Sequence, residues 1–155
     1  MKVLQSGVYG GEKSMLFGNY KHTVDKKGRV FIPAKLRDAL GESFMICCGI
    51  SGERCLCVYS NDEWEKLVEK INTLPNTKSS SVKRFLYSGA FTVECDAQGR
   101  ILIPNTLREY AELETEAQIV GMSTNLEIWN SASWEEKIKQ YTPESVASIM
   151  EELNF

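Results

Sequence analysis

Short runs of alternating apolar and polar residues are separated along this chain by turns and by stretches with helical spacing. Residues 20–24 alternate in this way, and a second β-prone run, 30–32, follows a turn that ends at Gly28. Two such runs around a turn predict a β-hairpin, with Gly28 in the left-handed conformation and Asp25 capping the turn. Pro33 then ends the strand and suits the first turn of a helix.

The pattern predicts a series of small elements after this hairpin. Apolar residues recur at helical or strand spacing, and residues that favour turns separate the runs. The expected elements are a helix over 34–40, strands over 43–48 and 55–59, and a helix capped by Asn61 or Asp62 that runs through Ile71. The stretch 73–81 is rich in Pro, Asn, Ser and Thr and is expected to be a linker, followed by a helix over 82–88.

The second half of the chain repeats the first. The segment V-D-K-K-G-R-V-F-I-P at 24–33 returns as C-D-A-Q-G-R-I-L-I-P at 95–104, an offset of 71 residues. A Leu-Arg pair follows each copy. The strands and helices expected in the second half have the same order, at 91–95, 100–103, 105–110, 118–122, 126–129 and 132–141, with a further C-terminal helix at 143–153. Two copies of one β-β-α-β-β-α unit imply an internal pseudo-twofold axis.

These elements predict an α+β protein with two related units. We expect a flexible extension, a first unit, a linker, a second unit and a C-terminal helix over 1–14, 15–73, 74–84, 85–141 and 142–155. A unit of about 70 residues buries too small a core to be more than marginally stable alone. The two units are therefore expected to share a core.

Charge changes this picture because it is distributed unevenly. Residues 1–84 contain 14 Lys and Arg against 9 Asp and Glu, a net +5, whereas residues 85–155 contain 4 against 12, a net −8. Part of the basic excess lies around the first hairpin and part lies at Lys78, Lys83 and Arg84. The asymmetry indicates different partners for different faces, with solvated surface lysines as the plainer alternative.

The cysteines do not form the pattern of a secreted disulfide framework. There are five, and four of them lie within eleven residues: Cys47, Cys48, Cys55, Cys57 and Cys95. This number and crowding favour reduced, buried thiols in a cytosolic protein. Their C-C and C-x-C spacings, with a single histidine, do not match the usual zinc ligand patterns, so no metal or other cofactor is expected. No apolar run approaches the length that spans a bilayer.

The repeated D-x-x-G-R-[VI]-x-I-P string resembles the SpoVT/AbrB family of bacterial transcription factors and antitoxins, in which swapped hairpins interleave to form one small barrel. Two tandem copies, M-L-F-G-N-Y near the start and L-E-I-W in the second copy are similar to the MraZ family, over residues 15 to about 141. The resemblance implies a cytoplasmic, nucleoid-associated transcriptional regulator of the division and cell-wall gene cluster. It also implies ring-shaped homo-oligomers that bind short direct repeats in double-stranded DNA.

The family's D-x-x-x-R motif falls on Asp25 and Arg29, and again on Asp96 and Arg100. A two-stranded ribbon fits the major groove, where an arginine beside the turn could contact guanine or phosphate with two hydrogen bonds. The alternative for each arginine is an ion pair with the aspartate of its own turn. The aspartates and the turn glycines, Gly28 and Gly99, are expected to be structural.

Lysines distinguish the two hairpins. Lys26 and Lys27 lie in the first turn, where they could contact phosphates, and Lys21, on the preceding strand, is a further candidate for DNA contact. The second turn has Ala97 and Gln98 at the lysine positions, so a smaller contribution is expected from Arg100.

Two other classes of function are weaker interpretations. An antitoxin-type module of this fold usually has one hairpin unit and a disordered tail that binds the toxin, whereas this chain has two units and a short helical tail. An enzyme is not expected, because His22 has no nearby nucleophile arrangement and the chain lacks a phosphate-binding glycine loop.

Overall fold

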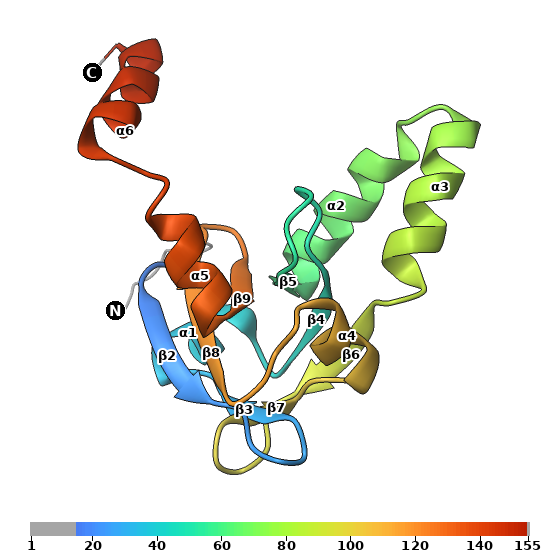
Figure 1. Cartoon of the computed structure of the whole chain (residues 1–155). Helices are drawn as coiled ribbons and strands as arrows, with labels where there is room; N and C mark the ends of the chain where they lie inside the picture. Colours follow the sequence, from blue (N-terminus) through green and yellow to red (C-terminus); the bar gives the residue numbers. More distant parts are fainter. Residues whose placement is uncertain (1–14, 155) are drawn as a thin grey trace, which may run out of the picture.

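The computed structural model of the chain describes residues 15–154, so the extension expected over 1–14 lies outside the described residues. The first half contains β2 (Asn19–Thr23), β3 (Arg29–Phe31), α1 (Ala34–Leu40), β4 (Ser43–Cys48), β5 (Leu56–Ser60) and α2 (Asn61–Asn72). The second contains β6 (Phe91–Glu94), β7 (Arg100–Leu102), α4 (Asn105–Tyr110), β8 (Glu116–Gly121), β9 (Leu126–Asn130) and α5 (Ser131–Ile138). The predicted β-β-α-β-β-α order of each half is confirmed (Figure 1).

Three further elements lie outside this repeated pattern. Helix α3 (Asn76–Tyr87) connects the halves, and α6 (Pro143–Met150) with the short 3-10 helix η1 (Glu151–Leu153) ends the described chain. Helices α2 and α3 pack against each other and project from the sheet, while α6 stands away from the rest of the molecule on the other side (Figure 1). None of the helices in the described residues is long and apolar enough to cross a membrane.

The two halves share one antiparallel sheet by exchanging their first strands. The six strands have the order β2-β8-β9-β5-β4-β6, so the first strand of each half pairs with a strand of the other half. Strands β3 and β7, again one from each half, form a separate two-stranded ribbon. The order is symmetric about the β9–β5 pair, as a pseudo-twofold axis requires.

The hairpin that the alternation predicts is present only at its turn. Gly28 donates its N–H to the Asp25 carbonyl at 2.9 Å, and one isolated bridge joins Val24 and Val30. Beyond that bridge the strands separate, because β2 pairs with β8 and β3 pairs with β7. Each half offers strands of nearly the same pattern, and local sequence does not distinguish pairing within a half from pairing between halves.

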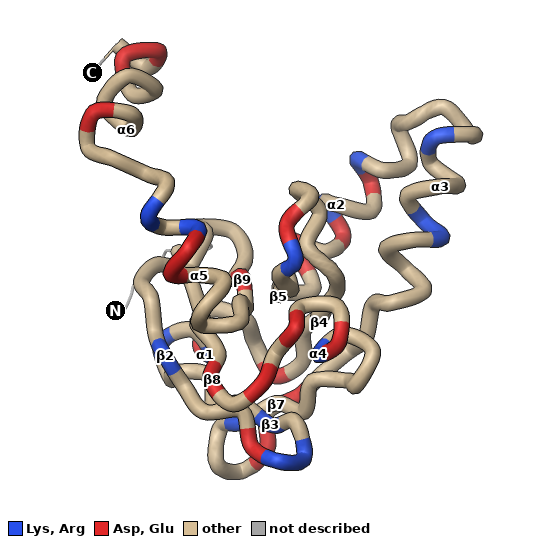
Figure 2. The backbone as a smooth tube through the Cα atoms, viewed as in Figure 1, with Lys and Arg blue, Asp and Glu red and all other residues tan. Residues whose placement is uncertain are grey.

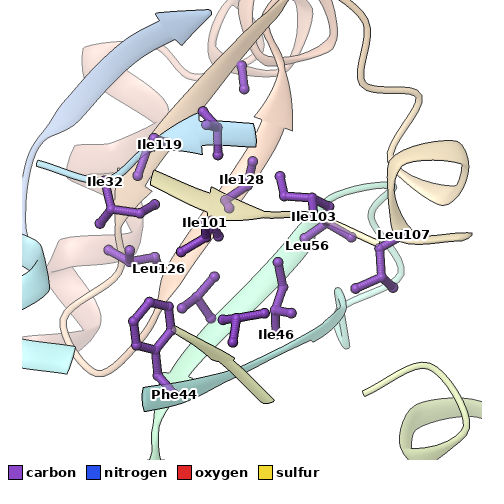
Figure 3. Packing of buried hydrophobic residues seen from close by; sticks show 14 of the residues in the cluster. Ile32, Phe44, Ile46, Leu56, Ile101, Ile103, Leu107, Ile119, Leu126 and Ile128 are labelled. Atoms are coloured by element: carbon purple, nitrogen blue, oxygen red, sulfur yellow. The ribbon is translucent and has the colours of Figure 1, made fainter. Parts of the chain in front are cut away.

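The hydrophobic core is filled from both halves at once. The ribbon contributes Val30 and Ile101, and the residues after it contribute Ile32 and Ile103, all with no exposed surface. They pack against sheet residues that are likewise fully buried: Phe44, Ile46, Leu56, Ile119, Leu126 and Ile128 (Figure 3). Burying one such side chain contributes about 1.5–3 kcal/mol, so separating the halves would expose much of what stabilises each.

Two helix beginnings differ from the expectation. Helix α2 is capped by Ser60, whose Oγ accepts a hydrogen bond from the Glu63 N–H at 3.3 Å, so the prediction of Asn61 or Asp62 as the cap is wrong. Strand β5 runs directly into the helix, which leaves the last strand residue as the cap. Helix α3 begins at Asn76, six residues earlier than expected, and takes up most of the expected linker; Val82 and Leu86 on it pack into a second apolar cluster, where tertiary burial outweighs weak helix propensity.

Candidate nucleic-acid interface

The two Asp-x-x-Gly-Arg turns lie at the same end of the molecule, on either side of the β3–β7 ribbon (Figure 1). Each turn is joined to the other half by a backbone hydrogen bond. The Gly99 carbonyl accepts from the Ile32 N–H at 2.9 Å, and the Gly28 carbonyl accepts from the Ile103 N–H at 3.0 Å. The pairing of the ribbon therefore fixes the two turns relative to each other.

Asp25 organises the first turn through both carboxylate oxygens. Its Oδ1 accepts the N–H groups of Lys27 and Arg29 at 3.0 and 2.8 Å, and its Oδ2 accepts the Arg29 Nε at 2.7 Å. Gly28 has φ +89°, as predicted. The backbone hydrogen bond from Arg29 is the main cause that lowers the pKa of Asp25 to about 2. Asp25 is thus an ionised cap that also holds the arginine.

The second turn has the same construction. Asp96 accepts the N–H groups of Gln98 and Arg100 and the Arg100 Nε, each at 2.9 Å. Gly99 has φ +82°, and the hydrogen bond from the Arg100 backbone lowers the pKa of Asp96. The repeated motif therefore builds one turn twice.

The ion pair weighed as an alternative role for the arginines is present in both turns. It uses Nε and leaves the outer Nη atoms of Arg29 without a hydrogen bond to any of the described residues. The Arg29 and Arg100 side chains keep 32% and 29% of their surface exposed. The Arg29 guanidinium is thus held at Nε alone, whereas Nη1 of Arg100 also lies 3.8 Å from the Oδ2 of Asp25. Both side chains keep exposed surface, so the ion pairs and an external contact are compatible.

A second pair of arginines, Arg37 on α1 and Arg108 on α4, lies behind the turns. Each packs behind the turn of the other half, Arg37 at Gly99 and Arg108 at Gly28. Arg108 donates from Nη1 to the carbonyls of Lys27, at 3.3 Å, and Ile103. A Cβ on Gly28 would collide with this guanidinium, and one on Gly99 would collide with that of Arg37. The guanidinium of Arg37 also lies 5.3 Å from the Phe31 ring centroid.

Sequence reasoning did not assign these two arginines to the site. The signal that could have identified them is the Leu-Arg pair that follows each Ile-Pro at the offset of 71 residues. A charged residue kept at the same place in both repeats indicates that it makes the same contact in each. Each helix arginine packs behind the turn of the opposite half and so depends on the exchanged strands.

The lysines make the two tips electrostatically different. Lys26 and Lys27 are exposed at the first turn, whereas Ala97 and Gln98 are exposed at the second. Figure 2 shows Lys and Arg at the first turn, at the end of the molecule where β3 and β7 lie. Lys21 lies on β2, and its Nζ is 4.0 Å from Glu116 and 3.9 Å from Glu135, so the structure pairs it with acidic residues of the second half.

The buried cysteines and the histidine have structural surroundings and form no metal site in the described residues. Cys47, Cys48, Cys55 and Cys57 are buried, and Cys47 and Cys48 point into clusters on opposite faces of the sheet, as strand geometry predicts. Burial raises the pKa of the Cys47 thiol. His22 packs edge-on against Phe31, with ring centroids 5.1 Å apart. Residues 15–154 contain no group of three or more His, Cys, Asp or Glu placed to hold a metal ion.

Comparison with known proteins gives a family that matches both repeats. The family described as "MraZ protein, putative antitoxin-like" matches residues 15–83 and again residues 86–153. The chain is 49% identical to the "Transcriptional regulator MraZ" of Caldanaerobacter subterraneus subsp. tengcongensis over 142 residues, 90% of this chain and 97% of that protein. It is 45% identical to the protein of the same name from Thermoanaerobacter sp. over 144 residues, 90% and 99% of the two chains. The Acetivibrio thermocellus protein of that name is 48% identical over 123 residues, 78% of this chain and 85% of its own length.

Proposed function

We propose that this chain, which belongs to the MraZ family, is a transcriptional regulator that binds double-stranded DNA through its two Asp-x-x-Gly-Arg turns. The observation that carries the proposal is the pair of identically built turns at one end of the molecule. Each holds an arginine by its Nε, and the arginine side chain remains about one third exposed. Relatives that share nearly the whole chain are named as transcriptional regulators.

The carboxylate of each turn prepares its arginine for a bidentate contact. A guanidinium that is already oriented loses less side-chain freedom on binding than a free one. Its two outer nitrogens can then donate to the O6 and N7 of guanine or to two phosphate oxygens. In this role Asp25 and Asp96 position the arginines and do not touch DNA themselves.

The first turn supplies most of the contact in this proposal. Lys26 and Lys27 are exposed beside Arg29 and suit neighbouring phosphates, which fix the position of the protein without reading sequence. Arg100 contributes less because its turn has no lysine. Lys21 is a peripheral member of the interface, since Glu116 and Glu135 compete for its charge.

The fold that presents the turns is proposed to be a swapped-hairpin barrel. Three pairings support it: β2 with β8, β6 with β4, and β3 with β7, each between one half and the other. The crossed contacts of Arg37 and Arg108 behind the turns have the same exchanged pattern.

A homo-oligomer explains how a chain with a net charge of −3 binds DNA. Sequence-independent contacts alone give dissociation constants of only ~10⁻⁴ to 10⁻⁶ M at physiological salt. Several identical subunits in a ring, each on one copy of a direct repeat, would gain affinity through effective concentration, roughly 10²–10⁴-fold when the geometry permits. The proposed setting is the cytoplasm, with the protein associated with the nucleoid.

The test is a selection of bound fragments from random double-stranded DNA with the purified chain. We expect recovery of one short box repeated in the same orientation at a fixed spacing. The matched control is the Arg29→Ala, Arg100→Ala double variant, which should recover unenriched DNA while keeping its fold. No enrichment by the wild type would overturn the proposal, and co-purification of a second protein that covers the turns would favour the antitoxin-type alternative.

A further inference from the structure

The C-terminal helix presents an apolar stripe that nothing in the described chain covers. Residues Val146, Ile149, Met150 and Leu153 recur at i, i+3, i+4 and i+7, and they are 47, 64, 37 and 62% exposed. Thr142 and Ser145 form a capping box at the start of α6, so the helix is locally well defined. An amphipathic helix of this kind gains its stability from packing its apolar face, which here remains unpacked.

Helix α5, which precedes the C-terminal helix, is held by an ion pair, whereas α6 itself contacts nothing that buries it. Lys137 on α5 lies 2.5 Å from the Glu53 carboxylate in the loop between β4 and β5. Every described residue after Lys137 is exposed, and α6 points away from the sheet (Figure 1).

An apolar groove of about 350 Å³ lies between α3, the β4–β5 loop and α4. Its lining includes Ile50 and Phe85, which are 53 and 56% exposed, together with Val82, Leu86 and Tyr110. The Phe85 and Tyr110 rings meet edge-on with centroids 6.3 Å apart, and the Phe85 side chain stays more than half exposed. Such exposed apolar surface beside a concave site is typical of a site that receives another apolar element.

The charges around the helix and the groove are complementary. Residues 142–154 contain Glu144, Glu151 and Glu152 and no Lys or Arg. Helix α3 contains Lys78, Lys83 and Arg84 and no Asp or Glu, and Lys78 shares its face with Val82 and Phe85. The guanidinium of Arg54 lies 4.8 Å from the centre of the Tyr110 ring at the groove. Opposite charge around matching apolar surfaces steers association and fixes the register of a helix in a groove.

We infer that α6 of one copy docks in the α3 groove of a second copy, with Val146, Ile149 and Leu153 against Phe85 and Ile50. The two surfaces are different parts of the same chain, so the contact is head-to-tail, and such a contact closes into a ring when the rotation permits. The inference rests on the homo-oligomer in the proposed function and names its interface.

The test compares the mass of two single variants by light scattering at micromolar concentration, without DNA. Ile149→Asp breaks the helix face and keeps the groove, while Phe85→Asp breaks the groove and keeps the helix. We expect each alone to fall from the wild-type oligomer to the mass of one chain. Their mixture retains one intact helix and one intact groove, so it should form a complex of two chains and grow no further.

The matched control is Ser148→Asp, which places the same charge on the opposite face of α6 and should keep the wild-type mass. If Ile149→Asp keeps that mass, or if the mixture fails to form a two-chain complex, the inference is overturned. Phe85→Asp at wild-type mass would also overturn it, because α6 would then dock elsewhere, for example on a second α6.

Charge reversal tests the same contact without changing the apolar residues of the groove. Lys78→Glu with Arg84→Glu, and separately Glu151→Lys with Glu152→Lys, should each lower the mass, and the combined variant should recover it. Failure of the combination to recover any mass would contradict the assigned orientation. Binding of Ile149→Asp to a single DNA box should stay at the wild-type level, so a failure of this interface and a failure of DNA binding are distinguishable.

Discussion

Asp25 and Arg100 lie in different halves of the chain, and the Oδ2 of Asp25 is 3.8 Å from the Nη1 of Arg100. The same oxygen is 2.7 Å from the Arg29 Nε, so one carboxylate contacts the arginines of both turns. Asp96 has no reciprocal ion pair with Arg29 among the described residues. The two turns are therefore electrostatically coupled, and the coupling runs through the first aspartate.

This asymmetry predicts different effects for two matched substitutions. Asp25→Asn should lower the DNA affinity more than Asp96→Asn, because it weakens the hold on two arginines and Asp96→Asn affects one. Mobility shifts of both variants check this. Equal effects of the two substitutions would mean that the 3.8 Å contact contributes nothing measurable.

The crossed packing of Arg108 behind Gly28 gives a stability prediction. Gly52 and Gly28 both have positive φ, but a Cβ on Gly52 would meet nothing within 4 Å, whereas one on Gly28 would displace Arg108. Gly52→Ala should therefore cost only the left-handed conformation, about 1–2 kcal/mol. Gly28→Ala should cost a further ~1–3 kcal/mol because the carbonyls that Arg108 bonds would be left without this donor. Urea unfolding of both variants measures the difference, and equal effects would show that Arg108 moves aside freely.

The lowered pKa of Asp25 predicts a loss of stability in acid. Its folded-state pKa of about 2 lies below the ordinary value of 3.8, so the unfolded chain binds the proton more readily. The contribution of this cap is fully present above about pH 4 and is lost as the pH falls toward 2. Melting temperatures of the wild type and Asp25→Asn should converge over this range, with the exposed Asp38→Asn as control. A gap that stays constant across this acid range would exclude this titration as its cause.

The local elements could be predicted well from the sequence, and their partners could not. The helix at 105–110 and the strand at 43–48 have the expected bounds, because glycine, proline and apolar spacing act within a few residues. Pairing of β3 with β7 depends on which of two similar strands is nearer in the folded chain, and that is a property of the whole fold. The resemblance to a known family suggested the exchange, and periodicity alone did not.

In the candidate site, too, the local turn structure could be predicted and the contacts between the halves could not. The roles of Asp25, Gly28 and the matching residues of the second turn follow from turn chemistry, and the structure confirms the caps and the positive φ values. Arg37 and Arg108 were not predicted, because each supports the turn of the other half, 62 and 80 residues away in sequence. Helix α3 begins earlier than the sequence predicts, because its apolar side chains pack against α2. This tertiary packing stabilises a segment whose Ser and Thr content favours a linker.

Cysteine reactivity provides an independent check of the buried sheet. Cys47, Cys48, Cys55 and Cys57 are buried, whereas Cys95 is partly exposed although burial also raises the pKa of its thiol. The thiol of Cys95 alone should react with an alkylating reagent such as iodoacetamide at mildly alkaline pH in the native protein, and all five cysteines should react after unfolding. Mass spectrometry of the alkylated chain identifies the site. Reaction of a second cysteine as fast as Cys95 would contradict the described burial.

Arg29 is expected to provide the main specific contact with DNA. Its Nε is held by Asp25 and its outer nitrogens face away from that bond, so Arg29→Ala removes the bidentate donor and leaves the backbone hydrogen bonds of the cap in place. Removing a bidentate base contact costs ~1–3 kcal/mol per site, and the costs in several engaged subunits compound. Specific binding should nearly disappear, while oligomer mass and melting temperature stay close to wild type.

The lysines of the same turn should affect DNA binding in a different way from Arg29. Lys26→Ala and Lys27→Ala should weaken binding to all sequences and reduce the salt slope by about 1 for each phosphate that is no longer neutralised. Arg100→Ala should have a smaller effect than Arg29→Ala, because Ala97 and Gln98 occupy the lysine positions of its turn. Mobility-shift titrations on the selected box at two salt concentrations separate these outcomes. If Arg29→Ala binds normally, or fails to bind only because it unfolds, then the arginine serves to stiffen the turn and DNA must be contacted elsewhere.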